Sequence, residues 1–566
     1  MHKRKMALMA SLLALFVAAA GCSSSGSGSS GSGGSTSTPA PSSSSGSSSS
    51  APAGSSSGSQ DAEPQFKEVK LTLLVNWNGS SATYDKDYTN TRVAQIIKEK
   101  TGVTIEFIGS NQNEVEKINT IFATQDLPDI YTGPAWGPEL DVLTKAAHEG
   151  QLYDFSGELH KYPNLAKLIQ PENVPYSVYY NSIDAYDGKK YILYNNFPAT
   201  GEDIRDWLYA MYVRKDIAEK VGDPSKVRTP EDLLDYLRRI KALNLKENGM
   251  PVIPLGGQAT GQLYRMFYSA ADDYVFYPDG SVRMEYMAPE FDQYVLFHRK
   301  LIEEELLDPE RWVQSDAIYR EKIAQGRYAV IYWHYYNLYD ATRDFVNSRP
   351  EAEYILLGPT NDANGDPFRT VFKARGANAT AITKKAKDPE AALRVLDFIA
   401  SDEGYLLTHY GIEGIHYDMV DGKPLVREEW YGKDVREEGI GLYSSIEGLD
   451  RTMSLGGGAF GWQFSPQTEM VRQITKQLRQ NGVEIAQGID PSAIYRAHPK
   501  YEQVSAAQSN MSRAWKEAAF KKSDEEALQI LKAAREELVR AGIEELQDAV
   551  AQAAKEMPMM KYLTGN

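Results

Sequence analysis

Tryptophans placed just after predicted strands are the side chains whose type and spacing suggest binding chemistry. Trp77 follows the apolar run 69–75, Trp136 follows the short run 129–133, and Trp333 closes the run 328–333. An indole ring offers a large rigid face and one N–H donor, which suits a ligand with C–H faces and hydroxyl groups. The polar and aromatic neighbours that complete these candidate positions are Asn76, Asn78, His334 and Tyr335.

Two further tryptophans extend this candidate set. Trp207 lies two residues after Arg205, and Trp462 follows the glycine-rich stretch 456–461. Packing in a core is the alternative for any one of these rings. The stretch 456–461 has the glycine spacing of a dinucleotide fingerprint. It does not follow a clear strand or open a helix, so we interpret it as a loop that could face a ligand.

Other motifs that could carry chemistry are incomplete. Residues 362–366 begin like a calcium loop, but Pro367 and Lys373 replace the glycine and the glutamate that such a loop needs. Asp126 and Asp129 flank a predicted strand, and we expect them to cap and orient it. The sequence contains neither a zinc-protease helix motif nor a phosphate-binding P-loop. We therefore predict no catalytic residue, no metal and no cofactor.

The elements that must position these side chains alternate between strands and helices. The pattern predicts strands at 69–75, 103–107 and 129–133, separated by helices at 88–100 and 115–123. Such alternation indicates a mainly parallel sheet with helices on both faces, and ligands of these sheets bind at the carboxyl ends of the strands. Later segments repeat this α/β pattern: a strand at 209–213, a helix capped by Thr229, a strand at 328–333, and helices at 388–400 and 523–557.

Composition limits the class of protein. The 566 residues carry 61 Lys and Arg against 77 Asp and Glu, a formal net charge of −16. Binding to nucleic acid needs a basic face, so this balance argues against it. The single cysteine excludes an intramolecular disulfide framework and a multi-cysteine metal site.

The N-terminus has the pattern of an exported and anchored protein. A basic start and an apolar run from Met6 to Ala20 are typical of a signal peptide. Ala19-Ala20-Gly21-Cys22 resembles a bacterial lipobox, with Ala19 where leucine is usual. We predict a signal peptide at 1–21 and a lipidated Cys22, the only cysteine of the chain. Residues 22–65 then form a Ser/Gly-rich linker that cannot bury a core.

Ordered phrases along the rest of the chain resemble a known family. The phrases are Asp126-Leu127-Pro128-Asp129-Ile130, the segments 150–155 and 161–165, Asp187-Gly188-Lys189-Lys190-Tyr191, Val213-Arg214-Lys215-Asp216, and the blocks 388–401 and 410–417. In this order they resemble the family 1 extracellular solute-binding lipoproteins of ABC transporters, in the large LipO-type group of Gram-positive bacteria. Glu413 and His416 lie in the last phrase, and the resemblance makes them candidate ligand contacts.

The resemblance implies an α/β fold of the two-lobe periplasmic-binding-protein type (type II) with a hinge. We place lobe 1 at 66–205 and 368–405, and lobe 2 at 206–367 and 406–566. It also implies a monomeric, non-catalytic protein held by its lipid at the outer face of the cytoplasmic membrane. Such a protein captures a carbohydrate, of oligosaccharide length, between the lobes and delivers it to an ABC permease.

Two alternatives remain open at this stage. A binding protein for peptides or another non-sugar solute would share every feature above. A surface enzyme that acts on polysaccharides would share the linker, the aromatic residues and the acidic charge, but it needs a tuned acid/base pair.

Overall fold

The computed structural model describes the part of the chain that forms the sheets and their helices. The described residues are 66–169, 188–199, 209–256, 263–268, 270–271, 274–277, 281–358, 361–366, 369–372, 376–431, 433–451, 455, 473, 476, 480, 484–487 and 492–556. Cys22, the signal peptide, the linker and the glycine-rich stretch 456–461 lie outside these ranges. No helix within them is long and apolar enough to cross a bilayer.

The first sheet has five strands in the order β2-β1-β3-β16-β4. Its strands are β1 (Val69–Asn78), β2 (Val103–Ser110), β3 (Ile130–Pro134), β4 (Ile192–Asn195) and β16 (Asn378–Ile382). The pairs β1–β2 and β1–β3 are parallel, which confirms the predicted parallel arrangement for these three strands. By contrast, β16 runs antiparallel between β3 and β4.

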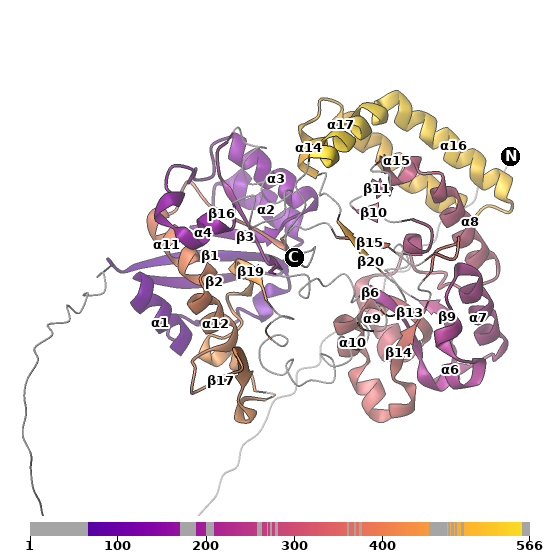
Figure 1. Cartoon of the computed structure of the whole chain (residues 1–566), viewed down its shortest axis with the longest axis horizontal. Helices are drawn as coiled ribbons and strands as arrows, with labels where there is room; N and C mark the ends of the chain where they lie inside the picture. Colours follow the sequence, from indigo (N-terminus) through magenta and orange to yellow (C-terminus); the bar gives the residue numbers. More distant parts are fainter. Residues whose placement is uncertain are drawn as a thin grey trace, which may run out of the picture. The chain divides into compact units, whose positions relative to one another are not determined.

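Helices cover both faces of the first sheet (Figure 1). On one face lie α2 (Glu114–Thr124) and α3 (Gly137–His148). On the other lies α1 (Arg92–Thr101), with α11 (Pro389–Ala400) and α12 (Asp402–Tyr410) packed against it. Helix α1 starts at Arg92, later than position 88, where the sequence pattern predicts its start. Thr91 Oγ1 accepts a hydrogen bond from the N–H of Ala94 and so caps the helix there.

The first hydrophobic core lies between this sheet and its helices. Leu71, Leu73 and Ile130 from the strands and Ile97 and Leu396 from the helices are almost fully buried in it. Gly102 ends α1 with a φ of 70°, a left-handed conformation that glycine adopts at no steric cost. The chain can then turn directly into β2, as the predicted stop at this glycine requires.

A second sheet has four strands in the order β14-β6-β13-β9. Its strands are β6 (Tyr209–Arg214), β9 (Ile253–Gly256), β13 (Tyr328–His334) and β14 (Tyr354–Leu357). Strand β13 is antiparallel to β6 and parallel to β9. The nearby helices are α6 (Lys215–Val221), α7 (Pro230–Ala242), α8 (Glu290–Glu303), α9 (Asp316–Ala324) and α10 (Tyr335–Ser348).

The start of α7 confirms the predicted N-cap. Thr229 Oγ1 accepts a hydrogen bond from the N–H of Asp232, and the Asp232 carboxylate accepts one from the N–H of Thr229. This reciprocal pair is a capping box, and Pro230 occupies the first turn, where a missing N–H costs nothing.

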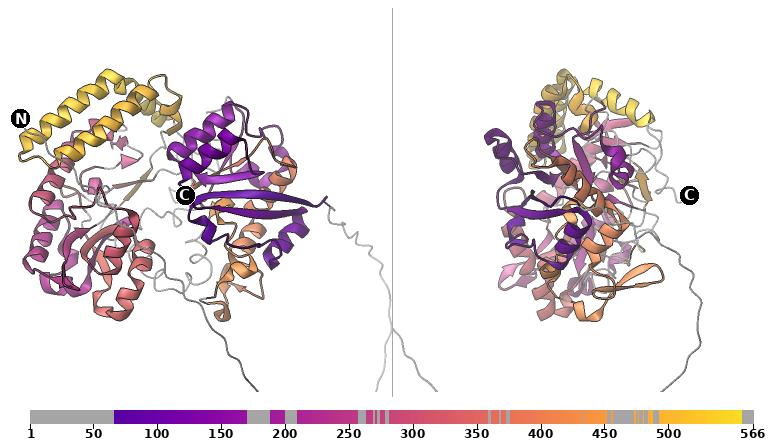
Figure 2. Two further views of the ribbon diagram at one scale, coloured as in Figure 1. Left: turned by 180° about the vertical axis from the view of Figure 1, so that it is seen from behind. Right: turned by 90° about the vertical axis from the view of Figure 1, so that its left-hand side faces the viewer.

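The C-terminal helices belong to the second hydrophobic core. They are α15 (Tyr501–Ala518), α16 (Asp524–Ala541) and α17 (Ile543–Glu556), shown in yellow and orange tones in Figure 2. Trp515, Leu531 and Leu538 from these helices pack with Leu237 and Leu301 in that core. Gly542 separates α16 from α17 with a φ of 95°, at the predicted break.

Residues around 440 contribute to the first core. Leu407, Ile440, Leu442 and Ile446 are buried against the β1–β3 side of the molecule, although the predicted boundary assigns 406–566 to the second lobe. The backbone N–H of Asn196 donates to the carbonyl oxygen of Glu447 over 3.0 Å. The division into lobes stays a prediction.

Hydrogen bonds to Asp129 connect the start of β3 with β1 and with the segment before α11. Its Oδ2 accepts hydrogen bonds from the N–H and the hydroxyl of Thr72 on β1, over 2.7 and 2.8 Å. Its Oδ1 accepts from the N–H of Lys387, just before α11, over 2.7 Å. This confirms the structural role expected for Asp129. Burial alone would raise the pKa of this carboxyl, but the N–H groups of Thr72 and Lys387 hold it below its ordinary value of 3.8.

We predict that Asp129→Asn lowers the free energy of unfolding by about 2–3 kcal/mol at pH 7, because hydrogen bonds to a charged acceptor are lost. A depressed folded pKa stabilises the protein above the unfolded pKa and loses that effect as pH falls through the folded value. The difference between variant and wild type should therefore narrow below about pH 4. Urea unfolding between pH 7 and pH 3 measures it, with Asp126→Asn as the exposed control. A difference that stays constant with pH would contradict this account.

Candidate functional site

Two tryptophans meet where β1 and β3 end. The rings of Trp77 and Trp136 lie 5.5 Å apart between centroids, at an interplanar angle of 60°. The indole N–H of Trp77 donates to Asn378 Oδ1 over 2.9 Å. Because β16 runs antiparallel to β3, its first residue lies at the edge where β1 and β3 finish. This group, Trp77, Trp136 and Asn378, is called the tryptophan edge below.

The asparagines that flank Trp77 have different environments. Asn76 is fully buried, and its side-chain amide donates to the carbonyl oxygen of Glu114 over 2.8 Å and to the Tyr131 hydroxyl over 3.0 Å. The hydrogen bonds of Asn76 therefore connect the start of α2 with the sheet. Asn78 is exposed, and its backbone N–H donates to Glu114 Oε1 over 2.9 Å. Of the two side chains, only that of Asn78 faces solvent.

Carboxylates gather beside the tryptophan edge. Glu114 begins α2, and Glu139 and Asp141 lie in the first turns of α3, directly after Trp136. Burial raises the pKa of Glu139 above its ordinary value of 4.5, and the charges of Glu114 and Asp141 raise it further. Glu114, Glu139 and Asp141 are not among the ligand contacts predicted from the sequence. Their position in the first turns of helices that follow β-strands is the signal that could have identified them.

Residues of the C-terminal region contact α3, the helix that follows Trp136. Arg496 on α14 (Ser492–Ala497) forms an ion pair with Asp141 and donates to the carbonyl oxygen of Gly137 over 3.3 Å. The Tyr501 hydroxyl lies 3.4 Å from Asp141 Oδ2. These contacts connect an element of the second core with the helix that follows Trp136. Asp141 is therefore paired with a cation.

The candidates on the second sheet lie on a different strand. Trp333 is only 6% exposed, and its ring makes an edge contact with Tyr319 at 5.1 Å. The Arg320 guanidinium carbon lies 5.0 Å from the centre of the same ring. His334 ends β13 and Tyr335 begins α10, and the structure describes their backbone but not their side chains. The predicted ligand contact of these three residues stays a prediction.

Glu413 and His416 lie in the turn after α12. His416 is fully buried, and its Nδ1 accepts a hydrogen bond from the N–H of Ile412 over 2.9 Å. Its ring packs 4.5 Å from that of Trp430, and burial lowers its pKa below 6.5. Glu413 is exposed. These contacts give His416 a clear part in shaping the turn, and a ligand contact for either residue stays a prediction.

Three predicted site residues, Arg205, Trp207 and Trp462, lie outside the described residues. Within the described ranges, no group of three or more His, Cys, Asp or Glu residues is arranged to hold a metal ion. The segment 362–366 is a turn, as expected. Asp362 Oδ1 accepts hydrogen bonds from the N–H groups of Asn364 and Asp366 over 2.8 and 3.0 Å.

The comparisons with known proteins identify the family to which this α/β fold belongs. A model of the bacterial extracellular solute-binding protein family matches residues 85–405, more than half of the chain, and the chain belongs to this family. It is 24% identical over 357 residues to the polygalacturonan/rhamnogalacturonan-binding protein YtcQ of Bacillus subtilis (strain 168). It is 22% identical over 327 residues to the lipoprotein LipO of the same organism.

Each of these alignments covers less than two thirds of the relative. The alignment with YtcQ covers 59% of this chain and 65% of YtcQ, and that with LipO covers 54% and 60%.

Solved structures establish the fold. The alginate-binding protein AlgQ2, solved without calcium ion, superposes with a TM-score of 0.61 at 16% identity, over 87% of this chain and 99% of that one. The S. pneumoniae ABC-transporter substrate-binding protein FusA, solved in complex with kestose, also gives a TM-score of 0.61 at 16% identity, over 86% and 99%. The predicted two-lobe α/β fold of solute-binding proteins is confirmed.

We predict that Glu139→Gln raises the melting temperature at pH 7, because the ionised carboxylate is partly desolvated and faces like charges. A raised folded pKa means that stability is full below the unfolded pKa and is lost as pH rises through the folded value. The stability that Glu139→Gln gains over wild type should therefore vanish near pH 4. At pH 7 the gain in the free energy of unfolding should stay below about 1 kcal/mol, since water still reaches this half-buried group.

Differential scanning calorimetry at pH 4 and pH 7 tests this expectation. Glu149→Gln, at the other end of the same helix, is the matched control and should not gain stability between the two pH values. A Glu139→Gln protein that is less stable than wild type at pH 7 would show that the carboxylate makes favourable bonds instead.

Proposed function

We propose that the protein captures a carbohydrate of oligosaccharide length between its two lobes and delivers it to the permease of an ABC transporter. Membership of the extracellular solute-binding family supports a binding role. Two similar proteins, YtcQ and AlgQ2, are described as polysaccharide-binding, and FusA was solved with kestose. The tryptophan edge is the observation on this chain that carries the proposal.

The tryptophan edge has the chemistry that a sugar needs. Trp77 uses its N–H for Asn378, so the orientation of its ring is fixed before any ligand binds. A T-shaped pair presents one ring face and one ring edge, and C–H-rich sugar faces pack on such surfaces. Asn78, Glu114 and Glu139 supply polar groups close by for hydroxyl groups. A few convergent polar groups on an aromatic surface are typical of ligand sites.

The charges beside the tryptophan edge favour a neutral sugar over a uronate. Among the described residues, Glu114 and Glu139 are acidic, and Arg496, which contacts the same helix as Glu139, is paired with Asp141. A carboxylate on the ligand would be repelled by this local charge as well as by the net charge of −16. The proposed ligand is therefore a neutral oligosaccharide, unlike the polygalacturonan in the name of YtcQ.

We propose the lobes as follows. Lobe 1 consists of 66–205 and 368–405, and lobe 2 of 206–367 and 406–566, with Leu407 and the residues 440–446 packed on the core of lobe 1. Closure of two such lobes around a ligand is a hinge motion. The contact of Arg496 with Asp141 joins an element of the second lobe to the helix that follows Trp136. It supports a ligand position near that helix.

We also propose that a lipid on Cys22 anchors the protein, as a monomer, at the outer face of the cytoplasmic membrane through the Ser/Gly-rich linker 22–65. The lipobox-like sequence before the only cysteine supports this, as does the similarity to a lipoprotein. Two or more acyl chains are needed for stable anchoring. The linker composition lets the domain stand away from the membrane.

We predict that a neutral oligosaccharide raises the melting temperature without being cleaved. At a ligand concentration 100-fold above Kd the folded state gains about 2.7 kcal/mol. A thermal-shift screen over neutral oligosaccharides, uronic oligosaccharides and peptides measures this, and chromatography of the sugar after incubation checks for turnover. A shift with peptides alone would contradict the carbohydrate proposal, and cleavage of the sugar would identify an enzyme.

Variants at the tryptophan edge extend this test to the site. Trp136→Ala removes one ring face and should weaken binding at least about tenfold, a loss of 1.4 kcal/mol. Trp77→Phe keeps a ring but loses the bond to Asn378, and should weaken binding less. Tyr431→Ala, which removes an exposed ring that is not among the predicted ligand contacts, is the control and should leave affinity unchanged. Equal affinity in all three variants and wild type would exclude the tryptophan edge as the site.

The anchor has a separate test. Cys22→Ser should move the protein from the membrane fraction to the culture medium or to a soluble fraction, because no thiol remains to accept lipid. Cell fractionation with immunoblotting measures the distribution, with Ser23→Ala as the control. A Cys22→Ser protein that stays in the membrane fraction would show that another segment holds it there.

A further inference from the structure

Two side chains of the C-terminal region converge on one carboxylate of α3, a helix of the first core. Arg496 on α14 forms an ion pair with Asp141 and donates to the carbonyl oxygen of Gly137 over 3.3 Å. The hydroxyl of Tyr501, at the start of α15, donates to Asp141 Oδ2 over 3.4 Å. We call this group the α3 contact: Arg496, Tyr501, Asp141 and Gly137.

The Arg496 side of the α3 contact is fixed to the second core. The ring of Tyr495 lies 5.5 Å from that of Tyr501 and 6.2 Å from that of Tyr274, which is buried in this core. The guanidinium carbon of Arg496 lies 5.9 Å from the centre of the Tyr495 ring, and its side chain is only 12% exposed. Because this packing restricts the side chain, little further entropy is lost when the ion pair forms.

The α3 contact adjoins the tryptophan edge. Gly137 follows Trp136 directly and has a φ of 68°, a left-handed conformation that glycine adopts without strain. Leu140 and Leu143 bury the next turns of α3 in the first core. A shift in the first turn of this helix would therefore also displace Trp136.

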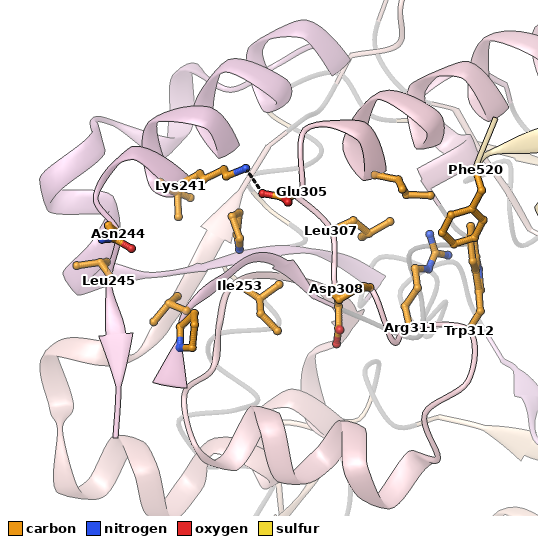
Figure 3. Close-up of a pocket in the computed structure, with 16 residues that line it drawn as sticks. Lys241, Asn244, Leu245, Ile253, Glu305, Leu307, Asp308, Arg311, Trp312 and Phe520 are labelled. Atoms are coloured by element: carbon orange, nitrogen blue, oxygen red, sulfur yellow. Dashed lines mark hydrogen bonds and ion pairs between the residues drawn. The ribbon is translucent and has the colours of Figure 1, made fainter. Parts of the chain in front are cut away.

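Other charged groups of the second core pair within that core. A cavity of about 390 Å³ there has Lys241, Glu305 and Asp308 among its lining residues. Lys241 pairs with Glu305 over 2.8 Å (Figure 3), and Asp308 pairs with Lys322 over 2.9 Å. These ion pairs stabilise one core, whereas the ion pair of Arg496 joins the two cores.

We propose that the α3 contact holds the two lobes in the closed arrangement, with Arg496 as the residue that connects them. This inference rests on the proposed function in one respect, the assignment of α3 and α14 to different lobes. A hinge motion separates the lobes, so a contact that crosses between them exists in the closed arrangement only. Such a contact increases the closed population by its own free energy. The closed fraction in turn sets the apparent affinity for a ligand that binds the closed lobes.

The distance between two spin labels tests the proposal without a ligand. The full chain with Cys22→Ser has no thiol left, so Glu149→Cys on α3 and Gln503→Cys on α15 can be labelled alone. Both positions are exposed. The two helices carry the α3 contact, so its loss lengthens the distance between the labels. We expect the short distance to predominate in this labelled background, and a predominantly long distance would overturn the proposal.

Variants of the α3 contact give the decisive comparison. Asp141→Asn and Arg496→Gln should each raise the ratio of long to short distances about fivefold, the upper range for a partly exposed ion pair. The double variant should add little, because either change alone removes the ion pair. Glu517→Gln, which removes an ion pair with Lys521 at the end of α15, is the matched control and should leave the ratio unchanged. Equal ratios in both single variants and the background would overturn the proposal.

Ionic strength provides a second measurement. Raising the salt concentration from about 0.05 to 0.5 M screens a partly exposed ion pair. The ratio of long to short distances should therefore rise with salt in the background and stay constant in Asp141→Asn. A background ratio that does not respond to salt contradicts the proposal, and this result also decides the question should the variant fail to fold.

The α3 contact and the carbohydrate proposal can fail separately. No ligand enters the label measurement, so a thermal-shift screen without any response to carbohydrates would contradict the proposed function alone. A protein that binds a carbohydrate, but whose label distances are the same in the background, Asp141→Asn and Arg496→Gln, would exclude the closing role of the α3 contact alone.

Discussion

The insertion of β16 between β3 and β4 is the constraint on which the first half of the structure depends. This strand comes from residue 378 onward, yet it completes a sheet whose other strands lie before residue 196. Its antiparallel direction brings Asn378 to the edge where β1 and β3 end. There it accepts the hydrogen bond that orients Trp77. The geometry of the tryptophan edge therefore depends on a pairing between distant parts of the chain.

The buried charged groups of the two cores differ in their hydrogen-bond and ion-pair partners. Asp129 in the first core is surrounded by N–H donors, and this keeps its carboxylate ionised. Arg214 in the second core likewise has Asp216 and Glu247 as partners at 2.7 and 3.0 Å. Arg311 has the burial of these groups without their partners.

Sequence patterns predict the elements of this protein better than the contacts between them. The strands at β1, β2 and β3, the Thr229 cap and the break at Gly542 follow from local periodicity and capping rules. The placement of Trp77 and Trp136 at strand ends was predictable for the same reason. Asn378 was not, because nothing local to residue 378 shows that it meets residue 77. The sequence also does not show which of two similar side chains is buried. Asn76 and Asn78 both flank Trp77, and only Asn76 lies in the core.

The place of β16 in the sheet also bears on how the chain acquires its fold. A chain is synthesised and exported with its N-terminus first. Strand β3, which ends at Pro134, is therefore made long before β16 begins at Asn378. During that interval one side of β3 has unpaired backbone groups, and such an edge can pair with another chain. Contacts between residues so far apart in sequence also slow folding. Correct assembly of the tryptophan edge is therefore a late event, and the newly exported chain stays prone to aggregation until β16 has paired with β3.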